Sequence, residues 1–419
     1  MESDAENSAR NVVGDMLEDG MKVLAVAYKE LTEKEESNRD NLTLIGYLAF
    51  FDRPNKSAAD AIERLVNLQI PVKVMTGDHA DVAVSVCRRL KIPTDRIITG
   101  PELENISQDD LTMLAEKVHV FAELTPNQKS QIISVLQNNG HTVGFLGDGL
   151  NDLPAEMQAD VGISVDTASS AVKEAADVIL MKKDLNVLEE GILEGRRVFV
   201  NMSKYIKITA SSNLGNIIAV VIASIFLPFF PMTSIQLLLL NLLYDIICLV
   251  LPWDEVDSEL CEKPLEWSGN HLSRFMMSFG PISSIFDVIT FAFMMFYLCP
   301  LLCGGNYFML SSIEQSHFIS LFQTGWFLES MWTQVLILYL LRTKKFPIFQ
   351  SRPSRIVILI TLTGIALFTI IVMTPVGSFI GMTKLPGSYF AFLIVVVFCY
   401  LMIVTLAKKI YVKKYDSLI

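Results

Sequence analysis

A series of long apolar stretches follows Lys204 in this sequence. An α-helix needs about 20 predominantly apolar residues to cross the hydrocarbon core of a bilayer. A helical pattern that begins at Val187 leads into the first stretch, so we expect a stalk that continues into the membrane. We predict six membrane-spanning helices, at Ile206–Pro228, Met232–Leu251, Met276–Leu298, Phe318–Leu341, Ile356–Met373 and Tyr389–Ala407.

The basic residues predict the orientation of these helices, because Lys and Arg concentrate on the cytoplasmic side of a membrane. The link after the third stretch carries no basic residue, and the link after the fifth stretch carries only Lys384. Six crossings that start in the cytosol place every strongly basic segment inside, so both termini are expected in the cytoplasm. Those segments are the link after the fourth stretch and the tail, with Arg342, Lys344, Lys345, Arg352 and Arg355, then Lys408, Lys409, Lys413 and Lys414.

The residues before the apolar stretches have a different composition. The whole chain is 51% hydrophobic and has a mean hydropathy of +0.42, which is too apolar for an ordinary soluble enzyme. The net charge of −11 belongs mainly to the front half, and this acidity argues against nucleic acid as a partner. The six cysteines form no CxxC pair and no Cys/His cluster, so the sequence does not indicate a zinc site.

Apolar runs alternate with amphipathic segments in the front half. This alternation predicts βαβ units and a parallel sheet. A further strand-like run at Lys22–Tyr28 has no partner of its own, so we expect it at the edge of a separate domain. The expected strands are Leu42–Phe50, Val72–Met75, Val118–Phe121, Thr142–Leu146 and Val161–Val165, and the expected helices are Ser57–Leu68, Ala80–Leu90, Asn127–Asn138 and Ala168–Ala176.

Three of these strand ends carry residues that suit phosphate chemistry. They run into Thr76-Gly77-Asp78, into Thr125-Pro126-Asn127-Gln128-Lys129, and into Gly147-Asp148-Gly149-Leu150-Asn151-Asp152. In parallel sheets, ligands gather at the carboxyl ends of the strands. A hydroxyl binds phosphate oxygens, a lysine neutralises charge and a carboxylate holds Mg²⁺. We therefore predict a phosphoryl-transfer site at one edge of one sheet.

Each segment also has a purely structural interpretation. Thr76–Asp78 fits a turn with a helix N-cap, and Thr125-Pro126 fits the start of a helix with a solvated Lys129. The acids of Gly147–Asp152 are harder to explain in this way, because charges beside an apolar strand are costly unless they are paired or metal-bound. The order of the three segments favours the phosphate site.

Polar residues inside the first two apolar stretches predict an ion site. Asn213 and Asn216 are three residues apart, and Asn241 and Asp245 are four apart, so each pair projects from one helical face. The short link Leu227–Pro231 makes the two helices antiparallel neighbours, so these side chains can meet at mid-membrane. Helix packing through amides is the alternative, and it explains the asparagines better than Asp245.

Other polar residues are weaker candidates. Asp287, Glu329 and Gln334 lie within apolar runs, and Glu329 either lines an ion pathway or pairs with another helix. The acidic segment Trp253–Glu266 is most simply interpreted as a solvated loop.

The order TGDH, TPNQK and GDGLND resembles the phosphorylation domain of P-type cation pumps, within the haloacid-dehalogenase-like superfamily. Asp52-Arg53-Pro54 stands where that family usually has an Asp-Pro-Pro hinge, and Gly162-Ile163-Ser164, Ala175–Leu180 and Gly195-Arg196 follow in the family's order. The combination of SSNLGN and NLLYD looks most like the magnesium-importing subgroup, whereas calcium pumps carry a glutamate in place of Asn216.

This resemblance implies a fold and a domain organisation. The fold is an α/β haloacid-dehalogenase-like domain with a Rossmann-like parallel sheet, followed by an all-α bundle of six transmembrane helices. Residues 1–41 would be the tail of a nucleotide-binding domain, 42–186 the C-terminal part of the phosphorylation domain, 187–205 the stalk and 206–419 the transmembrane domain. The protein would lie in a bacterial-type plasma (inner) membrane as a multi-pass protein, in contact with lipid.

The resemblance also implies roles for the residues that match the family's motifs. Thr76, with Gly77 and Asp78, would bind phosphate oxygens, and Lys129 would steady the phosphate charge. The catalytic Mg²⁺ would be held by Asp148 with Asp152, and Asn151 and Asp152 would complete the hydrogen bonding. ATP would be the substrate, and the transported Mg²⁺ would bind Asn213, Asn216, Asn241 and Asp245.

Two motifs of the family are not found in this sequence. The family's nucleophile is an Asp within Asp-Lys-Thr-Gly-Thr, and neither this string nor the family's Thr-Gly-Glu loop occurs here. We therefore expect this chain to be the C-terminal portion of a pump, to need the N-terminal part as a partner, and not to form a phosphoenzyme by itself.

Three functions are consistent with these features. The first is a P-type ATPase that couples ATP hydrolysis to magnesium transport. The second is a non-catalytic pump remnant or regulatory membrane partner, which the missing nucleophile favours and the retained phosphate motifs oppose. The third is a P-type pump for another cation such as calcium.

Overall fold

The structure is a computed structural model that describes residues 2–18, 20–29, 42–51, 57–182, 184–265, 267, 269–347 and 350–418. The expected hinge Asp52-Arg53-Pro54 lies outside these residues, as does Glu266 at the end of the acidic segment. The chain divides into two compact units, Met1–Ile192 and Leu193–Ile419.

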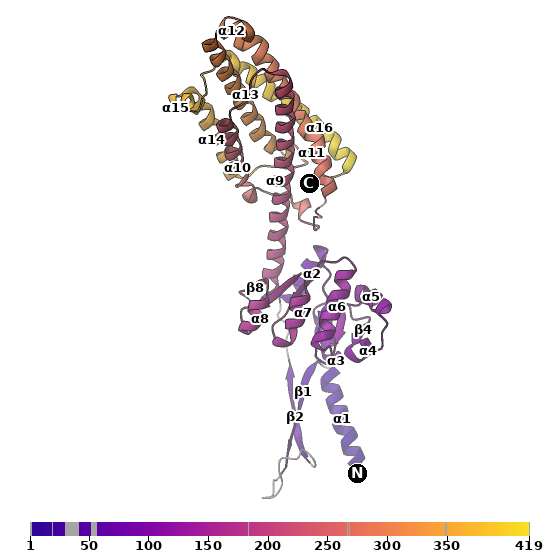
Figure 1. The fold of residues 1–419 in the computed structure, drawn as a ribbon. Helices are drawn as coiled ribbons and strands as arrows, with labels where there is room; N and C mark the ends of the chain where they lie inside the picture. Colours follow the sequence, from indigo (N-terminus) through magenta and orange to yellow (C-terminus); the bar gives the residue numbers. More distant parts are fainter. Residues whose placement is uncertain are drawn as a thin grey trace. The chain divides into compact units, whose positions relative to one another are not determined.

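The first unit begins with helix α1 (Glu2–Glu18) and a hairpin of strands β1 (Met21–Tyr28) and β2 (Thr43–Phe51) (Figure 1). The two strands pair antiparallel along their length, with a bulge at Val26/Ala27. The prediction that Lys22–Tyr28 lacks a partner is therefore wrong. The strand expected at Leu42–Phe50 is also not part of a parallel sheet. The two apolar runs can pair with each other because the entropy cost of closing the connection between them rises only slowly with its length.

The remaining strands of the first unit are all parallel, but they form two sheets rather than the one expected. The orders are β3-β5-β4 and β6-β7-β8, so β3 and β6 are each an edge strand. The strands are β3 (Val74–Met75), β4 (Ile97–Thr99), β5 (Val120–Ala122), β6 (Gly144–Leu146), β7 (Val161–Val165) and β8 (Val178–Leu180). The helices are α2 (Ala58–Asn67), α3 (Ala80–Arg89), α4 (Gly100–Leu103), α5 (Gln108–Lys117), α6 (Pro126–Asn138), η1 (Leu150–Asp152), α7 (Leu153–Gln158) and α8 (Ser170–Ala175).

The two sheets share side-chain packing although no backbone pairing joins β3 to β6 in the described residues. Met75 of β3 and Val143 pack against a buried cluster of Ile133, Phe145 and Ala155. Strands β3 and β6 therefore contribute to a common apolar core. The expectation of a single continuous sheet is corrected, whereas the expected parallel α/β architecture is confirmed.

The second unit is helical. Helix α9 (Leu185–Phe226) begins in the first unit and continues without a break, as the stalk pattern predicts (Figure 1). All six apolar stretches fall mainly in helices. The long helices after α9 are α10 (Ser234–Cys248), α11 (Gly269–Phe293), α13 (Ser312–Leu341), α14 (Arg355–Met373) and α16 (Gly387–Tyr415), and the short ones are η2 (Leu251–Trp253), η3 (Ser258–Leu260), the π-helical η4 (Met294–Leu298), α12 (Cys299–Cys303), η5 (Tyr307–Met309) and α15 (Pro375–Phe379).

Five helical segments of the described residues are long and apolar enough to cross a membrane, and they contain α9, α10, α11, α14 and α16. Helix α13 is long enough but carries Gln323, Glu329 and Gln334 among its apolar residues. These three polar side chains are nevertheless buried. Polar residues on a helix surrounded by other helices point into the bundle, which explains why α13 is less apolar than its neighbours.

Helices α9 and α11 approach closely through two glycines. A Cβ atom on Gly215 would lie 3.0 Å from the carbonyl oxygen of Gly280, and the Ser284 hydroxyl donates a hydrogen bond to the Gly215 carbonyl at 2.8 Å. Small residues and serine hydroxyls are the usual means of close helix packing in membranes.

A group of buried charges joins the loop after α10 to the end of α13, and we call Asp254, Arg342 and Lys204 the Asp254 cluster. Arg342 Nε lies 2.6 Å from Asp254 Oδ2, and Lys204 Nζ lies 3.7 Å from the same oxygen. The backbone N–H of Ser354 donates to Asp254 Oδ1 at 3.1 Å. Asp254 is only 6% exposed, so the prediction of a solvated acidic loop is wrong at this residue.

Candidate functional site

The phosphate-site residues that the structure joins directly are Lys129 and Asp152. Helix α6 starts with a capping box, in which Thr125 accepts from the Gln128 backbone N–H and the Gln128 side chain accepts from the Thr125 backbone N–H. This start places Lys129 on the buried face of the helix, where it is 7% exposed. Its Nζ atom lies 2.6 Å from Asp152 Oδ1, so the TPNQK and GDGLND segments meet, and the solvated Lys129 of the structural interpretation is excluded.

The turn after β6 depends on a glycine. A Cβ atom on Gly147 would lie 2.7 Å from the Asp152 Cβ atom, closer than real side chains approach. Asp152 Oδ2 accepts a hydrogen bond from the Asp148 backbone N–H at 3.4 Å. Both oxygens of the Asp152 carboxylate are therefore engaged by donors, while the Asp148 and Asn151 side chains are exposed at the turn.

These contacts test whether the turn can hold Mg²⁺. Carboxylate oxygens are ligands that Mg²⁺ prefers, and the ion usually keeps several waters and binds substrate phosphate oxygens. The exposed Asp148 carboxylate fits this role, and the Asp152 carboxylate is ion-paired with Lys129. The described residues contain no group of three or more His, Cys, Asp or Glu side chains that could hold a metal. An ion at Asp148 would therefore need further oxygens from water or phosphate.

Thr76, Gly77 and Asp78 lie at the end of β3, in the other sheet. The Thr76 hydroxyl accepts from the Asp78 backbone N–H at 3.0 Å, as in the turn of the structural interpretation. Asp78 forms an ion pair with Lys22 of β1 at 3.0 Å. Among the hydrogen bonds and ion pairs of the described residues, none joins Thr76 or Asp78 to Lys129 or Asp152.

Glu123 is a residue of this region to which the sequence analysis assigned no role. It follows β5 with φ +56°, a left-handed conformation that is uncommon for non-glycine residues. Its Oε1 accepts from the Ala80 backbone N–H at 3.2 Å and lies 3.4 Å from His79 Nε2. Glu123 thus fixes the end of β5 to the start of α3. No local sequence signal indicates this, because the contact joins segments 43 residues apart.

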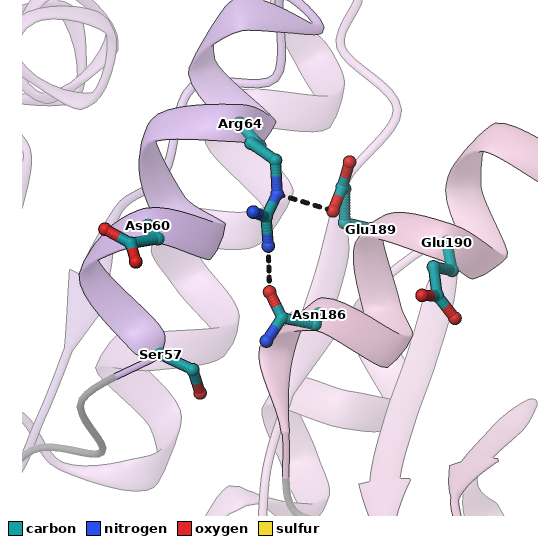
Figure 2. Close-up of a pocket in the computed structure, with 6 residues that line it drawn as sticks. All are labelled: Ser57, Asp60, Arg64, Asn186, Glu189 and Glu190. Carbon is teal, nitrogen blue, oxygen red and sulfur yellow. Dashed lines mark hydrogen bonds and ion pairs between the residues drawn. The ribbon is translucent and has the colours of Figure 1, made fainter.

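A surface hollow in the first unit lies between α2 and the first turns of α9. Figure 2 shows Arg64 of α2 pointing toward Asn186 and Glu189. Its Nε atom lies 2.7 Å from Glu189 Oε2, and its Nη2 atom donates to Asn186 Oδ1. None of the predicted phosphate-site residues lines this hollow. Its contacts instead fasten the start of α9 to α2.

The predicted ion-site residues have different surroundings. Asn216 of α9 accepts a hydrogen bond from Gln334 Nε2 of α13 at 2.8 Å. Asn213, Asn241 and Asp245 are exposed on α9 and α10. The described residues show no hydrogen bond among the four predicted ion-site residues. Gln334, a weaker candidate from the sequence, is therefore the partner that the structure gives to Asn216.

Comparison with known proteins covers nearly the whole chain. A model described as haloacid dehalogenase-like hydrolase matches residues 7–160. A model described as cation transporting ATPase, C-terminus, matches residues 229–410. The first match covers most of the α/β unit, and the second covers the helices from α10 onward.

Curated relatives give the same result. The magnesium-transporting ATPase, P-type 1, of Salmonella typhimurium is 43% identical over 404 residues, which are 95% of this chain and 43% of that protein. Its namesake in Escherichia coli K12 is 42% identical over 400 residues, or 94% of this chain and 43% of that protein. A calcium-transporting ATPase of Bacillus subtilis is 32% identical over 251 residues, or 58% of this chain and 28% of that protein.

The chain thus spans about 43% of the length of the first two relatives. Both halves of the structure match their expected counterparts, an α/β unit of haloacid-dehalogenase type and the helical C-terminal region of cation ATPases. The chain belongs to the P-type cation-transporting ATPases and corresponds to the C-terminal part of such a pump.

Proposed function

We propose that this chain supplies phosphate-binding and ion-binding parts of a magnesium-transporting ATPase, and that the longer protein couples ATP hydrolysis to Mg²⁺ transport. The observation that carries the proposal is the buried contact between Lys129 and Asp152 at 2.6 Å. It joins two phosphate-site segments next to Asp148, in a chain that also contains helices able to cross a membrane. The 43% identity to a magnesium-transporting relative supports Mg²⁺ as the cargo.

In this proposal Asp148 is the ligand of the catalytic Mg²⁺, which supplies positive charge beside the phosphoryl group when it is bound. Lys129 neutralises phosphate charge while Asp152 holds its ammonium group in place. Thr76, Gly77, Asp78 and Asn151 then donate to or orient phosphate oxygens at the sheet edge. For Thr76 this requires its hydroxyl to donate to phosphate while it accepts from Asp78, and a hydroxyl can do both.

The phosphorylated aspartate would enter between β3 and β6. Each of these strands is at the edge of its own sheet, so each has one row of backbone groups available for pairing. Their side chains already share the cluster around Ile133 and Phe145. A parallel strand from the N-terminal part would join the two sheets and bring its aspartate close to Asp148.

The transported ion would bind at the exposed polar face of α9 and α10. Asn213, Asn241 and Asp245 lie there among exposed apolar residues such as Ile217 and Leu242. A carboxylate facing lipid is costly, so we propose that membrane helices of the N-terminal part cover this face. One carboxylate and several amides, including Asn216, suit a Mg²⁺ ion that sheds its waters reluctantly.

Coupling between the two sites would run through α9. The helix is continuous from Leu185 to Phe226, and Arg64 fastens its first turns to α2. A change at the phosphate site that moves α2 would therefore act on the helix that carries Asn213 and Asn216.

The apolar helices and the basic links also indicate where the protein lies. The chain is a multi-pass membrane protein. We propose that it lies in a bacterial-type plasma (inner) membrane, with both termini and the basic links on the cytoplasmic side. The bacterial relatives support this assignment.

Two substitutions in the full-length protein test the proposal. Asp148→Asn should abolish phosphoenzyme formation from labelled ATP, while Asp109→Asn, at an exposed position on α5, should leave it unchanged. Asp245→Ala should abolish magnesium uptake into cells, whereas Leu242→Ala on the same exposed face should not. Normal phosphorylation in the first variant or normal uptake in the second would contradict the corresponding assignment.

The similarity to a calcium-transporting relative supports a second candidate function, the transport of another cation such as calcium. Purified full-length protein whose ATPase activity responds to Ca²⁺, and not to Mg²⁺ beyond the catalytic requirement, would favour that candidate. A regulatory role without catalysis would be excluded by an Asp-Lys-Thr-Gly-Thr sequence in frame upstream of the gene segment that encodes Met1.

A further inference from the structure

Two acidic side chains face each other deep in the helical unit. Asp287 of α11 and Glu329 of α13 are 2% and 1% exposed, and their carboxyl groups lie close enough to interact electrostatically. In an apolar bundle, two adjacent carboxylates cannot both stay ionised without a counter-ion. The question is what compensates their charge.

Basic side chains do not compensate it. No ion pair among the described residues involves Asp287 or Glu329. The other titratable groups near the pair are the hydroxyls of Tyr389 and Tyr400 on α16. The ring centroids of Phe286 and Tyr400 lie 5.3 Å apart, and those of Phe291 and Trp326 lie 4.9 Å apart. The pair is thus surrounded by aromatic groups rather than by cations.

The hydrogen bonds around the pair are asymmetric. Asp287 Oδ1 accepts from the indole Nε1–H of Trp326 at 2.7 Å and from the Ser330 hydroxyl at 3.4 Å. Glu329 Oε2 and Asp287 Oδ2 have no partner of this kind in the described structure. Donors stabilise the ionised form of a carboxyl group. Asp287 is therefore favoured as the anion and Glu329 as the neutral acid.

We propose that Asp287 and Glu329 form a proton-binding site inside the membrane bundle, with one proton that Glu329 holds and donates to Asp287. The proton is the compensating charge that the surroundings do not otherwise supply. A metal ion is disfavoured, because the Trp326 indole N–H points its positive end at Asp287. This assignment does not depend on which ion the pump carries.

A buried hydroxyl nearby indicates further unused hydrogen-bonding capacity. Thr290 lies three residues after Asp287 on α11 and is fully buried, and its Oγ1 also lacks a hydrogen-bond partner in the described residues. Residues three apart lie on one face of a helix. Polar oxygens therefore recur along this face of α11, where apolar packing alone would favour methyl groups.

Infrared difference spectroscopy on the full chain in lipid bilayers tests the proposal. The wild-type spectrum minus that of Glu329→Gln at neutral pH should show one protonated carboxylic acid in apolar surroundings. Because Glu156 is a second buried glutamate, a difference spectrum is needed rather than the absolute band. The matched control is Glu314→Gln, at an exposed glutamate near the start of the same helix, which should remove only carboxylate signal.

Three results would overturn the assignment. The first is loss of an ionised carboxylate band, and not of an acid band, in Glu329→Gln. The second is disappearance of the acid band on addition of Mg²⁺ at constant pH, which would make the pair a metal site. If Glu329→Gln does not fold, Asp287→Asn provides the second variant. This variant should keep the acid band of Glu329, but the frequency of the band should shift because the Asp287 carboxylate that accepts from Glu329 is gone. An unshifted band would be the third contrary result.

Discussion

Two buried groups of charged side chains in the helical unit differ in how their charge is compensated. In the Asp254 cluster, one carboxylate faces two cations, and Arg342 also donates to the backbone carbonyls of Ser351, Glu255 and Arg352. The Asp287–Glu329 pair has two carboxyl groups and no cation among its described contacts. Arg342 of the first group lies at the end of α13, and Glu329 of the second group lies within that helix.

This difference separates a structural role from a functional one. In the Asp254 cluster, a buried carboxylate that accepts hydrogen bonds at both oxygens holds the loop after α10 against α13. Unpaired buried acids in a membrane are costly and commonly mark sites of ion or proton binding.

Arg342→Met should have the largest effect on stability. It leaves Asp254 with only the more distant Lys204 as a counter-ion and removes the donors to three carbonyl groups. Breaking a buried ion pair from one side costs about 3–5 kcal/mol. Thermal unfolding of the chain in detergent, followed by circular dichroism, would measure the loss.

The control for Arg342→Met is Arg352→Ala, which removes an exposed arginine from the neighbouring link. Surface substitutions usually change stability by less than about 0.5 kcal/mol. Equal losses in the two variants would mean that the Asp254 cluster contributes nothing specific.

Trp326→Phe should have an intermediate effect, because it removes the strongest donor to Asp287 while keeping an aromatic ring beside Phe291. A hydrogen bond to a charged group contributes about 1.5–3 kcal/mol. Trp332→Phe is the matched control, since the Trp332 indole donates only to the neutral hydroxyl of Thr369 at 3.1 Å. Chemical unfolding of both variants would compare them, and a larger loss in the control would argue against an ionised Asp287.

The smallest predicted effect concerns Asp257, next to the Asp254 cluster. Burial opposes its ionisation, but hydrogen bonds from Thr343 and Ser351, with the charges of Lys345 and Arg342, keep its pKa below the ordinary value. A lowered pKa in the folded state stabilises the protein above the ordinary pKa, and this stabilisation is lost as the pH falls through the lowered value.

Asp257→Asn should therefore flatten the acid side of the stability profile, by no more than about 1 kcal/mol for a partly exposed group. Melting temperatures measured across the acid range would show it. An acid limb as steep as that of the wild type would exclude Asp257 as a contributor.

Much of this architecture can be predicted from the sequence, because its signals are local. The helix Ala80–Arg89 follows from amphipathic spacing, the helix Pro126–Asn138 follows from the capping residue Thr125 and Pro126, and the stalk pattern predicts the unbroken helix α9. The three-residue strands β4 and β8 were not predicted, since so few residues carry no periodicity. The division into two sheets was also missed, because the sequence does not show which strands pair.

The site was predictable in its residue types but not in its contacts. Lys129 and Asp152 could be named from their motifs, yet the ion pair between them joins residues 23 apart in sequence. Asp254 was interpreted as part of a solvated loop because its counter-ion Arg342 lies 88 residues further on. The roles of Thr76, Asp148 and Asp245 stay predictions that the proposed variants address.

The most direct test of the central distinction applies the same chemical change to both groups. Asp254→Asn and Glu329→Gln each replace a carboxyl group by an amide of the same shape, and their free energies of unfolding can be measured in one lipid or detergent system. We predict a loss of about 3–5 kcal/mol for Asp254→Asn, which removes the carboxylate nearest to two buried cations. For Glu329→Gln, whose amide resembles the neutral acid, we predict a change within about 1 kcal/mol. A large loss in Glu329→Gln together with a small one in Asp254→Asn would contradict the account.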